Sequence, residues 1–253
     1  GLGLVCFQLP MARWQQLAPA LFVAGVVLLV VVLIPGVGRE VNGAQRWLSL
    51  GPINLQPSEL MKIFAALYTV RKLDVMGSFI KGFLPMLVVI LFVGFLLLRE
   101  PDFGAFVVIT TIAFGILFLG GVNVRIFVLL ALLAVVGFVI LIWTSPYRRD
   151  RIFGFMDPWQ DAYGKGYQLS HSLIAFGRGE WLGVGLGGSV EKLFYLPEAH
   201  TDAVFAVIGE ELGVVGCLAV VALYLALLGA GMRVARRVTD RFGSLVAIGI
   251  TMW

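Results

Sequence analysis

Residues 196–213, LPEAHTDAVFAVIGEELG, place three groups able to do chemistry at the mouth of an apolar run. These groups are Glu198, His200 and Asp202. A carboxylate in this position can accept the proton of a weak nucleophile such as a sugar hydroxyl. An aspartate that opens a helix can instead cap the free backbone amides of that helix. The residues alone leave both roles open for Asp202.

Two further acids, Glu210 and Glu211, follow within the predicted helix. At about 1.5 Å per residue they lie about 12–13 Å beyond Asp202. At about 100° per residue, Glu210 is turned by about 80° from Asp202, and Glu211 lies on the opposite side. We therefore assign Glu210 as structural support for Asp202 and expect Glu211 to contact a neighbouring helix.

A second acid–base combination occurs in residues 38–62, GREVNGAQRWLSLGPINLQPSELMK. Glu59 and Lys62 are three residues apart, so they share one face of a helix and are expected to pair as buried charges. Such a pair is structural unless the substrate uses it. A third polar segment, residues 98–104 (LREPDFG), forms a tight turn between two apolar runs.

The composition is that of a membrane protein. The chain is 60% hydrophobic and 13% charged, whereas soluble domains contain about 25% charged residues. A membrane-spanning helix needs about 20 mostly apolar residues. Candidate membrane helices are residues 17–34, 58–70, 83–98, 103–121, 125–144 and 203–231, with partial ones at 1–9 and 242–253.

These helices predict an all-α, polytopic membrane bundle with one large extracytoplasmic loop, residues 145–201. We treat residues 1–253 as a single integral-membrane domain. The sequence has no initiator methionine, and it begins and stops within apolar segments. We therefore expect it to be a piece of a longer polytopic protein.

Loop charges predict the orientation. Basic residues gather in the short loops that follow the odd-numbered helices, for example Arg233, Arg236 and Arg237, which places those loops in the cytoplasm. The loops holding residues 38–62, 98–104 and 145–201 then lie outside. Long loops translocate largely regardless of charge, although the Arg148–Arg151 cluster near a helix end argues for the reverse orientation.

The remaining features have simple interpretations. The net charge of +4 matches inner-leaflet anchors and requires no nucleic acid. Cys6 and Cys217 lie in apolar sequence and are expected to pack without reacting. The glycine-rich residues 177–188 predict a flexible loop, with close approach to an anionic head group as the alternative. Residues 166–176 predict a short interfacial helix on which His171 is solvated, and no His/Cys cluster has metal-ligand spacing.

Four segments together carry a family resemblance. GREVNGAQRWLSLGP with LQPSELMK, REPDFG, YGKGYQLSHSLIAFGRGEWLGVGLGGSVEKL and YLPEAHTDAVFAVIGEELG closely resemble the SEDS proteins of shape, elongation, division and sporulation. GREVNG and LPEAHTD are the forms of the division-specific, FtsW-like branch. The family has ten membrane helices, so the resemblance implies that about eight are present here. The family usually has phenylalanine where this chain has Ala203.

The resemblance implies a peptidoglycan glycosyltransferase that joins lipid II units into glycan strands at the outer face of the bacterial inner membrane, at the division septum. The implied partners are lipid II, the lipid-linked glycan strand, a class B penicillin-binding protein and other membrane proteins of the division complex. No cofactor is implied with certainty, and a divalent cation at the pyrophosphate stays open.

The resemblance also assigns roles to residues. Asp202 maps to the family's proposed catalytic aspartate and is expected to be the general base. Glu59 and Lys62 map to the intramembrane acid and base, and Asp102 to the aspartate of the outer turn. We assign as substrate-binding Arg39, Arg46, Glu59, Lys62, Asp102, Arg151, Glu198 and His200. The cations of this set would bind the departing pyrophosphate.

Two alternatives come from other classes of protein. A flippase would move lipid II across the membrane, but transport sites lie near the midplane on broken helices in repeated halves. No internal repeat is evident here, and most of the acids lie at the outer boundary. A scaffold without chemistry would leave these acids unused.

Overall fold

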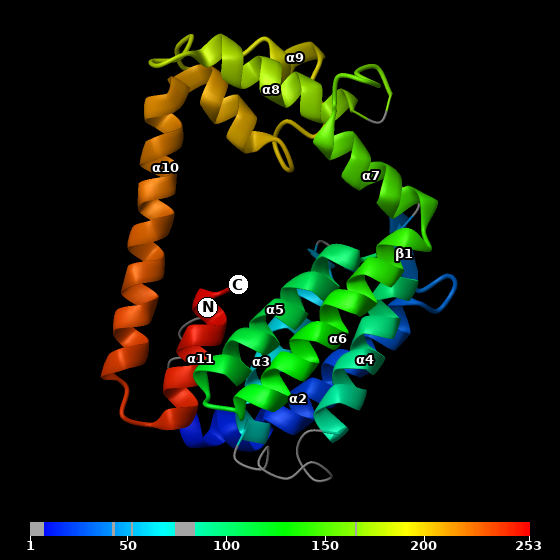
Figure 1. The fold of residues 1–253 in the computed structure, drawn as a ribbon, viewed down its shortest axis with the longest axis vertical. Helices are drawn as coiled ribbons and strands as arrows, with labels where there is room; N and C mark the ends of the chain where they lie inside the picture. Colours follow the sequence, from blue (N-terminus) through cyan, green and yellow to red (C-terminus); the bar gives the residue numbers. More distant parts are fainter. Residues whose placement is uncertain (1–7, 42–43, 52, 74–83, 165) are drawn as a thin grey trace. The chain divides into compact units, whose positions relative to one another are not determined.

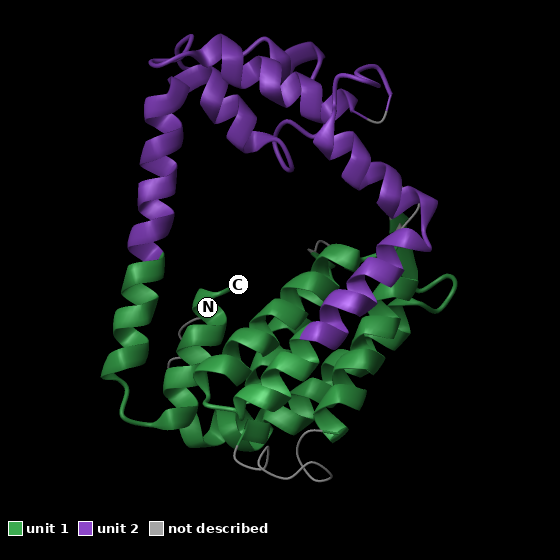
Figure 2. Ribbon diagram, viewed as in Figure 1, with its two compact units in different colours: residues 1–131, 228–253 green, residues 132–227 purple. Residues whose placement is uncertain are grey.

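The computed structural model describes residues 8–41, 44–51, 53–73, 84–164 and 166–253. Most of its regular structure is helical (Figure 1), which confirms the predicted all-α class. The chain divides into two compact units, Gly1–Ala131 with Leu228–Trp253, and Leu132–Leu227 (Figure 2). Helices α6 (Val124–Trp143) and α10 (Val204–Arg237) each contribute to both units.

The first unit is a helix bundle with α3 at its centre, packed against several other helices. Its elements include α2 (Met11–Val32), α3 (Pro57–Lys72), α4 (Leu84–Arg99), α5 (Phe103–Leu119) and α11 (Arg241–Thr251). Helix α3 packs against α2, α5 and α11. Fully buried side chains such as Leu29, Met61 and Leu97 fill one of its two cores. In a bilayer such contacts stabilise by close packing, because lipid tails are as apolar as leucine.

A small antiparallel sheet precedes α3 and was not predicted. Its strands β1 (Gly38–Val41), β2 (Ala44–Leu50) and β3 (Ile53–Leu55) pair in the order β1-β2-β3. The register between β1 and β2 shifts between Arg39 and Glu40, which is the mark of a bulge. Strand β2 also contacts α2 and α3, so the sheet fixes the entry to α3.

The second unit contains the whole of the predicted outer loop. Residues 145–201 are not a plain loop, because they form α7 (Pro146–Met156), α8 (Tyr167–Gly179) and α9 (Glu191–Phe194). Helix α8 confirms the predicted short helix at 166–176. Helix α10 is interrupted at Gly213, where φ is 64° and ψ is −164°.

In the part of the chain that the structure describes, three helices, α2, α6 and α10, are long and apolar enough to cross a membrane. Helices α4, α5 and α11 are apolar but shorter. The predicted helix at 1–9 lies almost wholly outside the described residues. Each of the other predicted helices coincides with an observed one within a few residues, except that α2 begins earlier and α10 ends later than predicted. The number of membrane crossings stays a prediction.

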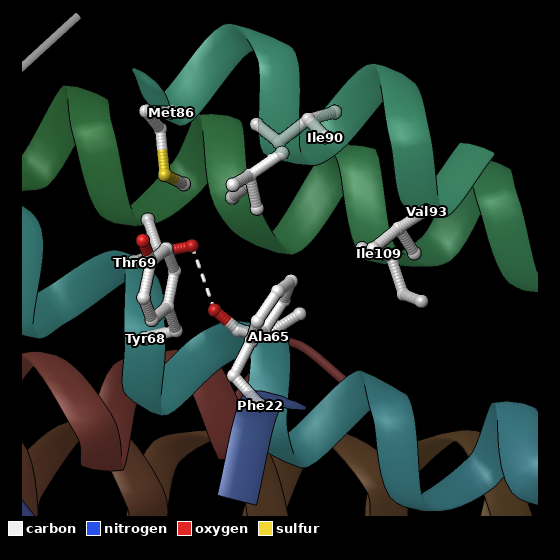
Figure 3. A pocket seen from close by; sticks show the side chains of 10 residues that line it. Phe22, Ala65, Tyr68, Thr69, Met86, Ile90, Val93 and Ile109 are labelled. Atoms are coloured by element: carbon white, nitrogen blue, oxygen red, sulfur yellow. Dashed lines mark hydrogen bonds between the residues drawn. The ribbon is translucent and has the colours of Figure 1, made fainter. Parts of the chain in front are cut away.

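An apolar pocket lies among α2, α3, α4 and α5 (Figure 3). Phe22 and Tyr68 stack in its wall with ring centroids 4.5 Å apart. The Thr69 hydroxyl donates to the Ala65 carbonyl at 2.7 Å, so it is already satisfied. The residues that line this pocket include no acid and no cation, so the pocket offers no group for acid–base chemistry.

Candidate functional site

Asp202 lies on a tight turn that leads into α10. The carbonyl of Glu198 accepts hydrogen bonds from the amides of Thr201 and Ala203, each at 3.1 Å. The hydroxyl of Thr201 donates to Glu198 Oε2 at 2.8 Å. Glu198 has a φ of 51°, a left-handed conformation that is uncommon outside glycine. This turn places Asp202 two residues before the start of α10.

A small apolar cluster holds the turn in place. Leu196, Ala203 and Ala206 are buried together with Ala175 of α8. Ala203, which stands where the family usually has phenylalanine, is only 5% exposed. The position next to Asp202 is therefore an anchoring point despite its small side chain.

The carboxylate of Asp202 is exposed. Helix α10 begins at Val204, and no described residue forms a hydrogen bond or ion pair with the Asp202 side chain. Within the described residues, the Asp202 carboxylate therefore does not cap α10, because it accepts no hydrogen bond from a backbone amide of that helix. His200, two residues earlier, is likewise exposed.

Glu210 supports a different part of the unit from the one predicted. Its side chain is fully buried and accepts hydrogen bonds from the Ser189 hydroxyl, from the Val190 amide at 3.1 Å and from Arg178 Nη1 at 3.3 Å. None of these hydrogen bonds involves Asp202. Glu210 instead joins α8 and the start of α9 to α10.

Two further pairs connect α8, α9 and α10. Glu211 accepts from Lys192 Nζ of α9, which confirms the expected contact with a neighbouring helix. The prediction that His171 is solvated is wrong, since its Nδ1 lies 2.7 Å from Glu191 Oε2. The His171 ring also stacks on Tyr195. No pattern in the sequence identified Glu191 as the partner.

In the first unit Asp102 is a structural hub. Its Oδ1 accepts from the Ala105 amide at 3.1 Å and caps α5. Its Oδ2 accepts from the Ser58 hydroxyl at 3.0 Å and from Gln56 Nε2 at 3.3 Å. Asp102 is 7% exposed, so the arrangement favours positioning the start of α3 over direct contact with substrate.

Glu100, which sequence reasoning did not select, is completely buried in the turn beside Asp102. Neither of its carboxylate oxygens has a hydrogen-bond partner among the described residues. Arg46 donates to the backbone carbonyls of Glu100 and Pro101 instead. Burial, and then the nearby Asp102 carboxylate, raise the pKa of Glu100 to about 8, with Arg46 opposing them. Glu100 is therefore mostly protonated at neutral pH.

Glu59 and Lys62 form the predicted pair on α3, with Lys62 Nζ 2.7 Å from Glu59 Oε1. The expectation that both charges are buried is only half correct. The Lys62 side chain is 12% exposed, whereas that of Glu59 is 46% exposed. Lys62 Nζ also lies 5.4 Å from the centre of the Trp253 ring, within the range of a cation–π contact.

The predicted phosphate ligands fall into two groups. Arg46 and Lys62 are engaged by backbone carbonyls and by Glu59 respectively. Arg39 of the first unit and Arg151 of the second are exposed. Neither has a hydrogen-bond or ion-pair partner among the described residues. Within the residues that the structure describes, no group of three or more His, Cys, Asp or Glu side chains could hold a metal ion.

A sequence model of the FtsW, RodA and SpoVE proteins, described as "Cell cycle protein", matches residues 2–253. The chain belongs to this SEDS family. Two curated members are both called "Probable peptidoglycan glycosyltransferase FtsW". The one from Aromatoleum aromaticum is 71% identical over 100% of this chain and 63% of its own length. The one from Nitrosomonas europaea is 52% identical over 99% of this chain and 66% of its own.

Solved structures of SEDS proteins have the same fold. One, described as "Structural coordination of polymerization and crosslinking by a peptidoglycan synthase complex", matches 98% of this chain and 70% of its own with a TM-score of 0.77 and 30% identity. The rod shape determining protein RodA of Thermus thermophilus matches 96% of this chain and 64% of its own, with a TM-score of 0.65 and 26% identity. This SEDS chain spans 56–63% of the length of the first three curated relatives that it matches.

Proposed function

We propose that this chain forms the greater part of a peptidoglycan glycosyltransferase that polymerises lipid II at the outer face of the bacterial inner membrane during cell division. Its membership of the SEDS family supports this assignment. So does the name shared by its curated relatives at 47–71% identity.

The observation that carries the catalytic assignment is the uncommitted carboxylate of Asp202. Among the acids assigned to the site, Asp102 caps a helix, Glu59 pairs with Lys62, and Glu198 and Glu210 accept hydrogen bonds. Within the described residues Asp202 alone of these acids has no such contact. A general base must be free to bind the proton that it removes, and Asp202 meets that condition.

The proposed step is attack of a sugar 4-hydroxyl on the anomeric carbon of the lipid-linked chain. Asp202 takes the hydroxyl proton while the bond to the lipid pyrophosphate breaks and that pyrophosphate departs. A positioned base contributes about 10²–10⁴ in rate to such a step. Among the assigned cations, exposed Arg39 and Arg151 have no hydrogen-bond or ion-pair partner within the described residues, so each is free to stabilise phosphate charge in its own unit.

The proposed partners follow from the same family. One matched structure is described as a complex that coordinates polymerization and crosslinking. We infer that this chain works with a crosslinking transpeptidase, a class B penicillin-binding protein, and with other membrane proteins of the division septum.

Purified protein given labelled lipid II in detergent tests the function. A polymerase makes glycan strands there with its transpeptidase partner present, whereas a flippase or a scaffold makes none because no bilayer exists. Orientation has its own test. A cysteine replacing Tyr163, which is 95% exposed, should react with an impermeant thiol reagent in intact spheroplasts, and one replacing Thr239 only after lysis. The reverse pattern would contradict the outer location of the site.

A further inference from the structure

The segment after α8 exposes large apolar side chains on a short stretch without charge. Trp181 is 72% exposed, Leu182 80% and Leu186 81%. No charged residue occurs between Trp181 and Val190. Exposed apolar groups that gather in this way mark a surface that binds a protein, a ligand or a membrane.

Backbone hydrogen bonds tie this segment to the interruption of α10. The break at Gly213 frees carbonyl groups that a continuous helix would use. The carbonyl of Glu210 accepts from the Val184 amide at 2.9 Å, and that of Glu211 accepts from the Gly185 amide at 3.1 Å.

On the other side of the break the direction of donation reverses. The amide of Val214 donates to the Glu180 carbonyl at 2.9 Å, and that of Val215 donates to the Trp181 carbonyl at 3.2 Å. Four backbone hydrogen bonds, two on each side of Gly213, therefore fix the position of this segment along the axis of α10.

The expectation of a flexible glycine loop is accordingly wrong here. Gly183, Gly185 and Gly187 have φ values of 80°, 97° and 81°, in the region that glycine occupies without strain. A Cβ on Gly183 would lie 2.1 Å from the carbonyl oxygen of Glu211. The glycines give the segment a fixed shape and allow it to approach α10 closely.

The sequence of α10 indicates where Gly213 lies relative to the hydrocarbon region of a membrane. From Val214 to Met232 there are 19 residues without a charge. At 1.5 Å per residue they span about 28 Å, close to the hydrocarbon thickness of about 30 Å. Arg233 begins the basic end of the helix. Gly213 therefore lies at one boundary of the hydrocarbon region, and so does the segment bonded across it.

We propose that residues 181–186 form a wedge that inserts Trp181, Leu182 and Leu186 into the bilayer boundary at which α10 enters. The exposed apolar face of α10 continues this surface, with Val215 54% and Leu218 60% exposed. Tryptophan is enriched at membrane–water interfaces. The wedge rests on the membrane span of α10 and not on the catalytic role of Asp202.

Spin labels test the wedge without any assay of glycan synthesis. Cysteines replace Leu182 or Leu186, one at a time, in protein whose Cys6 and Cys217 are changed to serine. The labelled protein is placed in vesicles of phosphatidylethanolamine and phosphatidylglycerol without a partner protein. Collisions with oxygen, which concentrates in lipid, are compared with collisions with a water-soluble nickel chelate. Tyr163 provides the aqueous control, and Leu223, which is 70% exposed within the span, provides the lipid control.

We expect labels at 182 and 186 to resemble the label at 223. Their ratio of oxygen collisions to nickel collisions should be at least several-fold higher than the ratio at 163. Access to nickel equal to that at 163 would place the segment in water. Protection from both reagents would mean that protein covers it. Either result overturns the wedge and leaves the proposed glycosyltransferase activity unaffected.

Discussion

Arg178 and Glu210 form an ion pair whose two ends differ in exposure. Arg178 Nη1 lies 3.3 Å from Glu210 Oε1, and the Arg178 side chain is 45% exposed while that of Glu210 is completely buried. A buried carboxylate requires hydrogen bonds and a nearby positive charge. The two neutral donors, Ser189 and Val190, supply part of that requirement.

Replacing Arg178 should therefore harm the protein more than replacing its partner. Arg178→Ala strands a buried charge and is expected to cost about 2–3 kcal/mol, below the 3–5 kcal/mol of a fully buried pair because Ser189 and Val190 still donate. Glu210→Gln leaves an exposed guanidinium and should cost about 1 kcal/mol. Thermal unfolding in detergent measures both, with the exposed Arg236→Ala as control. An Arg178→Ala variant as stable as that control would contradict the role of the pair.

The Glu59–Lys62 pair predicts an asymmetry that two equally buried charges would not show. Glu59→Ala strands the mostly buried Lys62 ammonium, whereas Lys62→Ala strands a carboxylate that is 46% exposed. Glu59→Ala should therefore lower the melting temperature more. A double-mutant cycle should give a coupling energy of about 1–2 kcal/mol. Additive effects would mean that the two residues act separately, with at least one of them engaged by substrate.

Glu100 predicts a pH dependence of stability. Its pKa of about 8 in the folded protein exceeds the ordinary value of 4.5, so the folded state holds a proton that the unfolded state releases. The stability that this proton contributes is complete below about pH 4.5 and is lost as the pH rises to about 8, at about 1.4 kcal/mol per pH unit. Glu100→Gln, which mimics the protonated acid, should flatten this part of the curve. Parallel melting curves for the two proteins between pH 5.5 and 8.5 would refute the assignment.

The helices could be predicted because long apolar runs define them in the sequence. Residues 103–121 and 125–144 correspond closely to α5 and α6. The sheet does not stand out in the sequence because its strands are only three to seven residues long, although an Asn-Gly pair, a strong hairpin signal, stands between β1 and β2. Helix α7 was missed because PYRRDRIFGFM has no long apolar stretch.

Tertiary contacts account for the rest of the differences. The geometry of one helix identified Glu210 as a supporting residue, but its partners come from α8 and the segment before α9. The burial of Glu100 depends on how the turn between α4 and α5 packs, and no local sequence pattern encodes it. The glycine-rich segment has the composition of a flexible loop, and only the break at Gly213 explains its fixed shape.

As the general base of strand polymerisation, Asp202 should be indispensable for activity but not for folding. Asp202→Asn should leave folding unchanged, since no described residue forms a hydrogen bond or ion pair with the carboxylate, and asparagine also suits a helix start. An amide cannot accept the hydroxyl proton, so activity should fall at least about a hundredfold. Asp202→Glu should recover little, because a displacement of about 1 Å can cost about 10²-fold.

The decisive measurement is the amount of glycan strand made from lipid II by equal amounts of folded wild-type, Asp202→Asn and Asp202→Glu protein, each with the transpeptidase partner. Asp157→Asn, a change at another exposed aspartate of the same unit, serves as the matched control. We expect strands from the wild-type and control proteins and at most about 1% of that product from Asp202→Asn. Near-normal product from Asp202→Asn would mean that Asp202 is not the base, and Glu198 or Asp102 would become the candidates.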